Sequence, residues 1–211
     1  MVDAALPYIL SAVLAYLLGN VQFAVIFSRA LHHDDVRKYG SGNAGSTNML
    51  RVYGAKSGLI TFIGDFGKGM LAVFLGRWIA GEICGYIAAL FVVLGHCYPI
   101  LSKLRGGKGV ASTFGILCVI KPLYALAITA VCFAMLLLTR TVSIVSLTGA
   151  TLFLLLAVAF SRGNVSLIIT AALLWALIVA RHRDNILRII NKEESKVLQK
   201  RPKEKKNANT I

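Results

Sequence analysis

The chain has 211 residues and a formal charge of +14, from 23 Lys and Arg against 9 Asp and Glu, yet 57% of its residues are hydrophobic and its mean hydropathy is +0.72. A soluble nucleic-acid binder with this charge would have a hydrophilic surface, and a disordered chain would lack the apolar content, so both classes are excluded. Only four cysteines occur, all inside or bordering apolar segments, which excludes a disulfide scaffold and predicts small apolar core residues; no CxxC or Cys/His metal spacing appears. A polytopic membrane protein fits both the charge and the hydropathy.

Seven apolar segments are candidates for membrane crossing, which takes about 20 residues in a helix. In chain order they cover residues 6–27, 58–75, 83–101, 110–120, 123–138, 142–160 and 165–180. The fourth is short enough to be a half-length or re-entrant helix, and Lys121-Pro122 separates it from the fifth. We therefore expect an all-α polytopic membrane protein of about seven transmembrane helices, some of them short. One kinked helix over 110–138 would instead give six helices and leave both termini on the same side.

The distribution of Lys and Arg predicts the orientation, because cytoplasmic connections carry an excess of both. With seven helices and the N-terminus outside, the inner connections and the C-terminal end hold 19 of the 23 Lys and Arg, and the outer connections hold three. We therefore expect a cytoplasmic C-terminus. A single transmembrane domain is expected over 1–194, and a basic, disordered tail that anionic lipid attracts over 195–211, so the charge is no evidence for nucleic acid.

Three stretches rich in glycine and polar side chains fall on this inner side, at residues 39–51, 104–109 and 181–185. An enzyme that works at a membrane needs its reactive groups at one depth. The coincidence of the three stretches on one face therefore predicts a functional site there.

The first stretch contains Gly40, Gly42 and Gly45 at the spacing of a dinucleotide-binding fingerprint. The charged run 33–39 precedes it in place of a hydrophobic strand, and no βαβ pattern follows, so that interpretation fails. Glycines still allow consecutive N–H groups to converge on an anion. The side chains that could add donors are Ser41, Asn43, Thr47, Asn48 and Arg51. The alternative is a glycine-rich turn that merely connects two helices.

The second stretch, Gly106-Gly107-Lys108-Gly109, opens an apolar helix but lacks the upstream glycine and the Ser/Thr of a nucleotide-binding P-loop. A glycine loop at a helix N-terminus attracts anions, and Lys108 adds a full charge, so we expect phosphate there. A positive-inside lysine beside a flexible loop is the alternative.

Five further polar side chains lie inside predicted helices or at their ends. His182 and Asn185 are three residues apart, on one face of a continuing helix, and His182 could be an acid/base, a phosphate donor or a helix cap. Asp65 and Lys68 could pair within the membrane, either to fix helix packing or to support the loop donors. His96 lies near the inner end of its helix. Haem binding by two histidines lacks a CxxCH motif or a second histidine pair, so we expect no cofactor and no metal.

Five motifs occur in the order Gly-Ser-Gly-Asn-Ala-Gly-Ser-Thr-Asn-Met-Leu-Arg (40–51), Gly-Asp-Phe-Gly-Lys-Gly (64–69), Gly-His-Cys-Tyr-Pro (95–99), Gly-Gly-Lys-Gly-Val-Ala (106–111) and His-Arg-Asp-Asn-Ile (182–186). Together they resemble the bacterial acyl-phosphate-dependent glycerol-3-phosphate acyltransferase family, over about residues 5 to 194. The resemblance implies a seven-helix enzyme of the inner membrane, facing the cytoplasm, that transfers a fatty acyl group from acyl phosphate to the 1-hydroxyl of sn-glycerol 3-phosphate. The products would be lysophosphatidic acid and phosphate, in the first committed step of phospholipid synthesis. It also implies functional coupling to the enzyme that produces acyl phosphate.

The same resemblance implies roles for individual residues. Ser41 and Arg51 match the family's essential Ser and Arg, and Ser143 matches its serine at the start of the sixth helix. The third motif usually closes with Gly-x-Glu; here Glu194 fits by spacing, and Lys192 stands in place of the glycine. We expect catalytic roles for Ser41, Asn43, His182 and Asn185. We expect phosphate binding by Gly42, Thr47, Asn48, Arg51, Gly106, Gly107, Lys108, Gly109 and Ser143, with Asp65, Lys68, His96 and Glu194 in support.

Acyl phosphate is an activated mixed anhydride, so the implied reaction needs two anions held together and a hydroxyl aimed at a carbonyl, with no metal or covalent intermediate. Either His182 or a substrate phosphate oxygen could take the proton, and the acyl tail would enter sideways from the bilayer. The alternative function is a transporter or channel for a phosphorylated metabolite, which a basic vestibule and an intramembrane Asp65–Lys68 pair would also suit. Transport requires polar residues through to the outer face, and the outer connections are short and nearly featureless. A structural or assembly protein would not need three donor-rich loops on one side.

Overall fold

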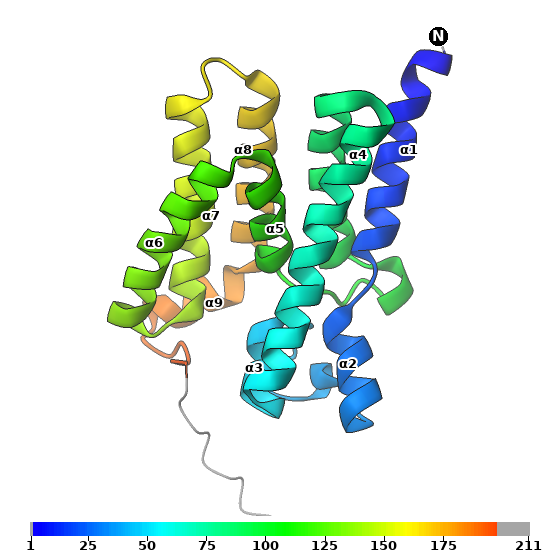
Figure 1. Ribbon diagram of the computed structural model, residues 1–211. Helices are drawn as coiled ribbons and strands as arrows, with labels where there is room; N and C mark the ends of the chain where they lie inside the picture. The colour runs from blue at the N-terminus through cyan, green and yellow to red at the C-terminus, as the bar shows by residue number, and fades with distance from the viewer. Residues whose placement is uncertain (1, 198–211) are drawn as a thin grey trace, which may run out of the picture.

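Every regular element in the computed structural model, which describes residues 2–197, is a helix (Figure 1). The α-helices are α1 (Val2–Gly19), α2 (Phe23–His32), α3 (Ser46–Tyr53), α4 (Ala55–Cys97), α5 (Val110–Ile120), α6 (Pro122–Thr139), α7 (Val142–Phe160), α8 (Val165–Arg181) and α9 (Arg183–Ile190). Two short 3-10 helices, η1 (Val36–Lys38) and η2 (Ile100–Ser102), lie in connections. The prediction of an all-α chain is confirmed.

The first predicted span is broken in its middle. The sequence predicted one helix over 6–27, but α1 ends at Gly19 and α2 begins at Phe23. The Nζ atom of Lys68 donates hydrogen bonds to the carbonyls of Gly19, at 3.3 Å, and Val21, at 2.6 Å. A cation from α4 therefore satisfies carbonyls that the break removes from the helical ladder.

The helix α4 is a hairpin of two antiparallel arms, as the two apolar segments 58–75 and 83–101 predicted. Ala80 and Gly81 leave the helical conformation, with φ of −158° and +77°, and the chain reverses there (Figure 1). The Nε atom of Arg77 lies 2.9 Å from Glu82 Oε1 across this turn. The hairpin packs along α1 and forms one side of the bundle (Figure 1).

The connection at Lys121 separates two helices rather than kinking one. Lys121 has φ −145° and ψ 76°, and Pro122 occupies the first turn of α6, where its missing N–H costs nothing. In Figure 1 α5 is a short helix that stops inside the bundle, and α6 descends beside it. The alternative of a single kinked helix over 110–138 is therefore wrong.

Four helical stretches among residues 2–197 are long and apolar enough to cross a membrane: Ala4–His32, Ala55–Ser102, Pro122–Thr139 and Val142–Phe160. A fifth arises if α8 and α9, which meet at a bend of 62°, form one span. The stretch Ala55–Ser102 contains both arms of α4, and α5 is a shorter apolar helix. The N-terminus and the end of the described chain lie at opposite ends of the bundle (Figure 1). The count of seven and the orientation in the membrane stay predictions.

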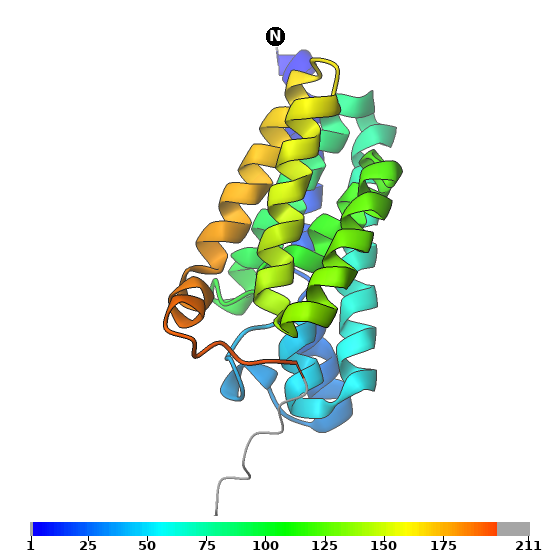
Figure 2. The ribbon, with the colours of Figure 1, turned by 90° about the vertical axis from the view of Figure 1, so that its left-hand side faces the viewer.

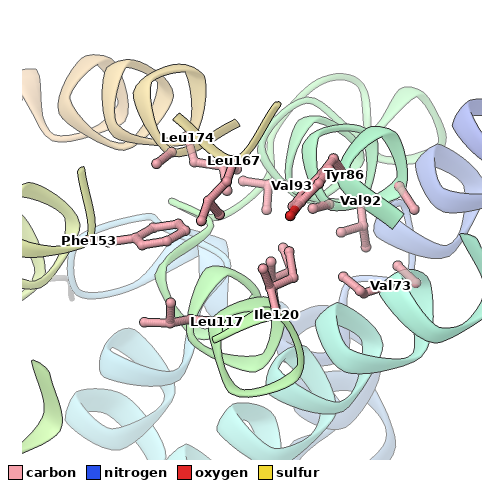
Figure 3. Packing of buried hydrophobic residues seen from close by; sticks show 14 of the residues in the cluster. Val73, Tyr86, Val92, Val93, Leu117, Ile120, Phe153, Leu167 and Leu174 are labelled. Atoms are coloured by element: carbon pink, nitrogen blue, oxygen red, sulfur yellow. The ribbon is translucent and has the colours of Figure 1, made fainter. Parts of the chain in front are cut away.

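The core joins the α4 hairpin to α5, α7 and α8. Val92, Leu117, Phe153 and Leu174 come from these four helices, belong to one cluster of packed side chains (Figure 3) and are almost fully buried. A Cβ atom at Gly69 would lie 2.1 Å from the carbonyl oxygen of Ser112, so glycine allows α4 and α5 to pack closely. This packing fixes the N-terminus of α5, and the glycine loop before it, against the inner part of the bundle.

Short helices and loops gather at one end of the bundle. Figures 1 and 2 show α2, α3 and α9 at this end, together with the connections that precede α3 and α5. The predicted tail begins at residue 195; residues 195–197 cross beneath the ends of α6 and α7 in Figure 2, and 198–211 lie outside the described residues.

Candidate active site

A cavity of about 900 Å³ lies at this end of the bundle, and the three polar stretches meet around it. It is lined by most of the residues that the sequence singled out: Ser41, Asn43, Thr47, Asn48, Arg51, Asp65, His96, Lys108, Gly109, Ser143, His182, Asn185 and Glu194. Gly42, Lys68, Gly106 and Gly107 are not among the lining residues. The expectation that the three stretches share one face of the bundle is confirmed by this common cavity.

The first loop is shaped by Asn48, which is 1% exposed in the first turns of α3. Its Oδ1 accepts a hydrogen bond from the Ser41 N–H at 2.9 Å, and its Nδ2 donates to the carbonyls of Val36 and Tyr39, both at 3.1 Å. Asn48 was expected to bind phosphate, but its amide hydrogens are engaged within the loop. The N–H of Gly42 likewise donates to the Tyr39 carbonyl, at 3.0 Å. Both residues thus hold the loop in shape.

The remaining polar groups of the first stretch border the cavity. Ser41 and Asn43 lie on the loop, and Thr47 lies in the first turn of α3, where backbone N–H groups have no intrahelical acceptor. Arg51 follows one turn later and also lines the cavity. This wall therefore presents hydroxyl, amide and guanidinium donors, a composition suited to an anion.

The second loop packs on His96 and on the end of α8. A Cβ atom at Gly107 would lie 2.1 Å from His96 Nε2, and the Gly107 N–H donates to the His96 carbonyl at 3.1 Å. Arg181 donates from Nε to the Gly107 carbonyl at 3.1 Å and from Nη2 to the Gly106 carbonyl at 3.2 Å. Gly106 and Gly107 were expected to bind phosphate. Their contacts with His96 and Arg181 instead fix the loop, and the next residue, Lys108, lines the cavity.

Lys108 is held by a polar network that joins four parts of the chain. Its Nζ atom donates to Asn185 Oδ1, and Asn185 Nδ2 donates to Ser143 Oγ at 2.9 Å and to Glu194 Oε1 at 2.6 Å. Ser143 Oγ donates to the same Glu194 oxygen at 2.6 Å, and Arg188 Nε donates to Glu194 Oε2 at 2.8 Å. Asn185 and Ser143 therefore position Lys108 and the carboxylate relative to each other.

The network and its surroundings shift two pKa values. Burial lowers the pKa of Lys108 to about 8, with Glu194 opposing this effect and the charges of Arg188, Arg181 and Arg51 contributing to it. Burial alone would raise the pKa of Glu194, but hydrogen bonds from its three network partners outweigh that effect and lower it. Glu194 is thus ionised at neutral pH, while Lys108 is a cation that can lose its proton under mildly alkaline conditions.

His182 lies at the bend between α8 and α9, and 2% of it is exposed. Its Nδ1 is 2.8 Å from the carbonyl oxygen of Ile178. A carbonyl only accepts, so Nδ1 carries the hydrogen, and in the neutral ring Nε2 is an acceptor. The chain thus fixes the tautomer that a general base needs.

Asp65, Lys68 and His96 form a buried group beneath the loops. Lys68 Nζ and Asp65 Oδ1 are 2.8 Å apart, so the predicted pairing of these two side chains is confirmed. His96 Nδ1 lies 3.3 Å from the same carboxylate oxygen. Asp65 and His96 line the cavity, whereas Lys68 turns to the carbonyls at the break between α1 and α2. Lys68 therefore stabilises the helix break, and Asp65, which pairs with Lys68, also lines the cavity.

The end of α9 explains how this chain does without the glycine of its third motif. Lys192 adopts φ +61°, the left-handed conformation that glycine favours, and the turn brings Glu194 back to the network. Sequence reasoning missed Arg188 and residues 195–197, all of which line the cavity. The spacing of Arg188, three residues after Asn185 on an amphipathic helix, could have indicated it.

Within residues 2–197, no group of three or more His, Cys, Asp or Glu side chains is arranged to hold a metal ion. The polar groups around the cavity are mainly cations and neutral donors. Such a lining favours the binding of anions.

Comparison with known proteins gives consistent similarities. The family model described as glycerol-3-phosphate acyltransferase matches residues 9–192. Proteins named glycerol-3-phosphate acyltransferase are 40% identical over 192 residues in Thermoanaerobacter sp. (strain X514), covering 91% of this chain and 96% of that one, and 40% identical over 186 residues in Bacillus subtilis (strain 168), covering 88% and 95%.

Two solved structures of PlsY (YgiH), an integral membrane glycerol 3-phosphate acyltransferase, are similar throughout. The glycerol 3-phosphate form has a TM-score of 0.84 at 34% identity, and the lysophosphatidic acid form a TM-score of 0.80 at 33% identity. Each similarity covers 90% of this chain and 94% of the other.

Proposed function

The chain belongs to the glycerol-3-phosphate acyltransferase family, and we propose that it transfers a fatty acyl group from acyl phosphate to the 1-hydroxyl of sn-glycerol 3-phosphate. It is a multi-pass membrane enzyme that acylates glycerol 3-phosphate, the first step of phospholipid synthesis. The observation that carries the proposal is the cavity of about 900 Å³, in which Arg51, Lys108 and His182 are brought together from three distant stretches.

The reaction places two phosphate groups in one cavity. The 1-hydroxyl oxygen attacks the acyl carbonyl carbon, the bond between that carbon and the phosphate oxygen breaks, and phosphate leaves with the electron pair. The hydroxyl proton passes to a base. Because the donor is already activated, the enzyme contributes by holding the two anions and orienting the hydroxyl. The cationic side chains of Arg51 and Lys108 supply the charge for this, with hydroxyl and amide donors from Ser41, Asn43 and Thr47.

Either His182 or a phosphate oxygen of the substrate takes the hydroxyl proton. The bond from His182 Nδ1 to the Ile178 carbonyl leaves Nε2 as the acceptor, which supports the histidine. In His182→Gln, the pH dependence of the rate should lose its acidic limb, because that limb reports protonation of the imidazole base. An unchanged profile shape would assign the proton to a phosphate oxygen instead.

An adjoining apolar cavity offers a place for the acyl chain. It has a volume of about 280 Å³ and is lined by Leu50, Ala55, Gly58, Leu59 and Phe62, together with Ser46 and Thr47. Leu50, Phe62 and the first turn of α3 belong to both cavities. A chain lying along α3 and α4 would thus place its acyl phosphate head group beside the basic wall while its tail remains in the bilayer.

The topology completes the proposal. We place the enzyme in the bacterial inner membrane with seven helices, the N-terminus outside and the cavity facing the cytoplasm, where the basic residues gather and where an enzyme that produces acyl phosphate would deliver the donor. In a cysteine-free background, a cysteine replacing Arg162 should react with an impermeant thiol reagent in intact cells, and one replacing Arg105 only after permeabilisation. The reverse pattern would contradict the orientation.

Phosphate release tests the reaction itself. The purified enzyme should release phosphate from acyl phosphate only when glycerol 3-phosphate is present, and Ser41→Ala and Lys108→Ala should lose turnover while folded. Lys56→Ala is the matched control, because Lys56 is exposed near the same end and does not line the cavity. Acylation from acyl-CoA or acyl carrier protein but not from acyl phosphate would overturn the donor. Counterflow of glycerol 3-phosphate without chemistry would indicate a transporter.

A further inference from the structure

The three residues after Glu194 form a strap beside the active-site cavity. Residues 195–197, here called the strap, all line that cavity, and they follow the stretch 9–192 that the family model matches. Figure 2 shows this part of the chain leaving α9 and crossing beneath the ends of α6 and α7. The strap therefore lies just beyond the part of the chain that the family model matches.

Both ends of the strap are attached. On one side, Glu194 is fixed by hydrogen bonds from Ser143 and Asn185 and by its ion pair with Arg188. On the other side, the Val197 N–H donates to the carbonyl of Arg140 at 2.7 Å. The backbone between these attachments has little freedom, so the one charged side chain of the strap, Lys196, is kept next to the cavity.

Lys196 differs in solvent exposure from two other cationic side chains that line the cavity, Lys108 and Arg188. Lys108 is half-buried and bonded to Asn185, and Arg188 is paired with Glu194, whereas the side chain of Lys196 is exposed. An exposed ammonium group interacts weakly with an anion and is screened by salt, but it raises the local concentration of that anion. Such a group suits the capture of a soluble substrate rather than the chemical step.

We propose that Lys196, held by the strap, captures glycerol 3-phosphate by its phosphate group as that substrate enters the cavity from water. The inference rests on the proposed function. Glycerol 3-phosphate is a water-soluble dianion and must pass the exposed rim. Acyl phosphate is retained in the bilayer by its chain, and the apolar cavity proposed for that chain is lined by residues of α3 and α4 and not by the strap.

Kinetics of Lys196 variants test this role. Lys196→Ala and Lys196→Gln should raise the KM for glycerol 3-phosphate about two- to five-fold at low ionic strength, with smaller changes in kcat and in the KM for acyl phosphate. The difference should fade near 0.5 M salt, since the Debye length then falls to about 4 Å. Lys196→Arg, which retains the charge, should have a KM for glycerol 3-phosphate close to that of the wild type. Lys56→Ala is the control for loss of a nearby lysine. An unchanged KM in Lys196→Ala, or an equal rise for both substrates, overturns the proposal.

A second pair of variants tests the strap. Val197→Pro removes the N–H that bonds to Arg140, and Val197→Ala keeps it, so the difference between the two isolates that hydrogen bond. Val197→Pro should show the higher KM for glycerol 3-phosphate, and adding Lys196→Ala to it should cause little further change. Equal KM values in the two Val197 variants overturn the role of the strap.

Calorimetric titration of the purified enzyme with glycerol 3-phosphate separates the two levels of inference. A wild-type enzyme that neither binds glycerol 3-phosphate nor releases phosphate overturns the proposed function, and this inference with it. A wild-type enzyme that is active, with Lys196→Ala binding glycerol 3-phosphate equally well at low salt, overturns only the capture role.

Discussion

The protonation of Lys108 should set the alkaline limit of the enzyme. Its pKa of about 8 lies within an accessible range, because burial and the neighbouring arginines disfavour the ammonium form. In the free enzyme about half of the Lys108 side chains carry a proton at pH 8 and about a tenth at pH 9. Since only the ammonium form binds phosphate well, kcat/KM for glycerol 3-phosphate should fall about tenfold per pH unit above this pKa.

The depth of this fall follows from the interaction that is lost. A charge-assisted hydrogen bond is worth about 1.5–3 kcal/mol, so kcat/KM should level off at roughly one-tenth to one-hundredth of its maximum. The assay is the initial rate of phosphate release at subsaturating glycerol 3-phosphate between pH 6.5 and 9.5, with spontaneous hydrolysis of acyl phosphate subtracted. Saturating substrate should move the limb to higher pH, because a bound phosphate favours the protonated lysine.

Two variants make this prediction specific. Glu194→Gln removes the carboxylate that raises the Lys108 pKa, so the limb should move to lower pH. Lys108→Arg keeps the positive charge at every accessible pH, so its remaining activity should not fall near pH 8. An alkaline limb at the same pH in Lys108→Arg as in wild type would refute the assignment to Lys108.

Three further substitutions test how the site is held. Glu194→Ala leaves the buried partners of this carboxylate without their acceptor, and it should cost about 1–3 kcal/mol of stability, measured by thermal unfolding in detergent, whereas Glu194→Gln should cost less. Gly107→Ala should lower activity strongly because its Cβ would lie 2.1 Å from His96 Nε2; Gly67→Ala, where nothing lies within 4 Å, should be neutral or slightly stabilising, and equal effects would contradict the packing argument. Lys68→Met removes the cation of a buried ion pair and leaves His96 as the partner of Asp65, so it should destabilise by about 3–5 kcal/mol; an unchanged melting temperature would show that the pair does not support the fold.

The location of the site could be predicted from the sequence, but the bonding of several of its residues could not. Glycine clusters stand out in an apolar chain, and the charge distribution placed them on one face, so their meeting around one cavity was expected. A motif does not indicate which N–H groups are already bonded. The amide of Asn48 and the N–H of Gly107 are engaged with backbone carbonyls, and those contacts depend on how the loops fold onto η1 and His96.

Helix boundaries were predictable where the chain carries a local signal. Pro122 marks the start of α6, and the polar turn at Gly81 divides α4. The break after Gly19 was missed although Gly19, Asn20 and Gln22 interrupt the apolar pattern, because the cation that stabilises it, Lys68, comes from another helix. The strap was missed for a similar reason, because residues 195–197 resemble any basic tail until Glu194 and Arg140 fix their ends.

The small apolar cavity beside the active site has a kinetic consequence. Under the proposed reaction, the donor stays in the leaflet while only its head group reaches Lys108, so its effective concentration is a number of molecules per unit area. The rate should then follow the mole fraction of acyl phosphate in the surrounding lipid or detergent and decline as inert lipid dilutes it. Glycerol 3-phosphate, which arrives from water, would follow its bulk concentration. The rate would thus depend on the surface concentration of one substrate and on the bulk concentration of the other.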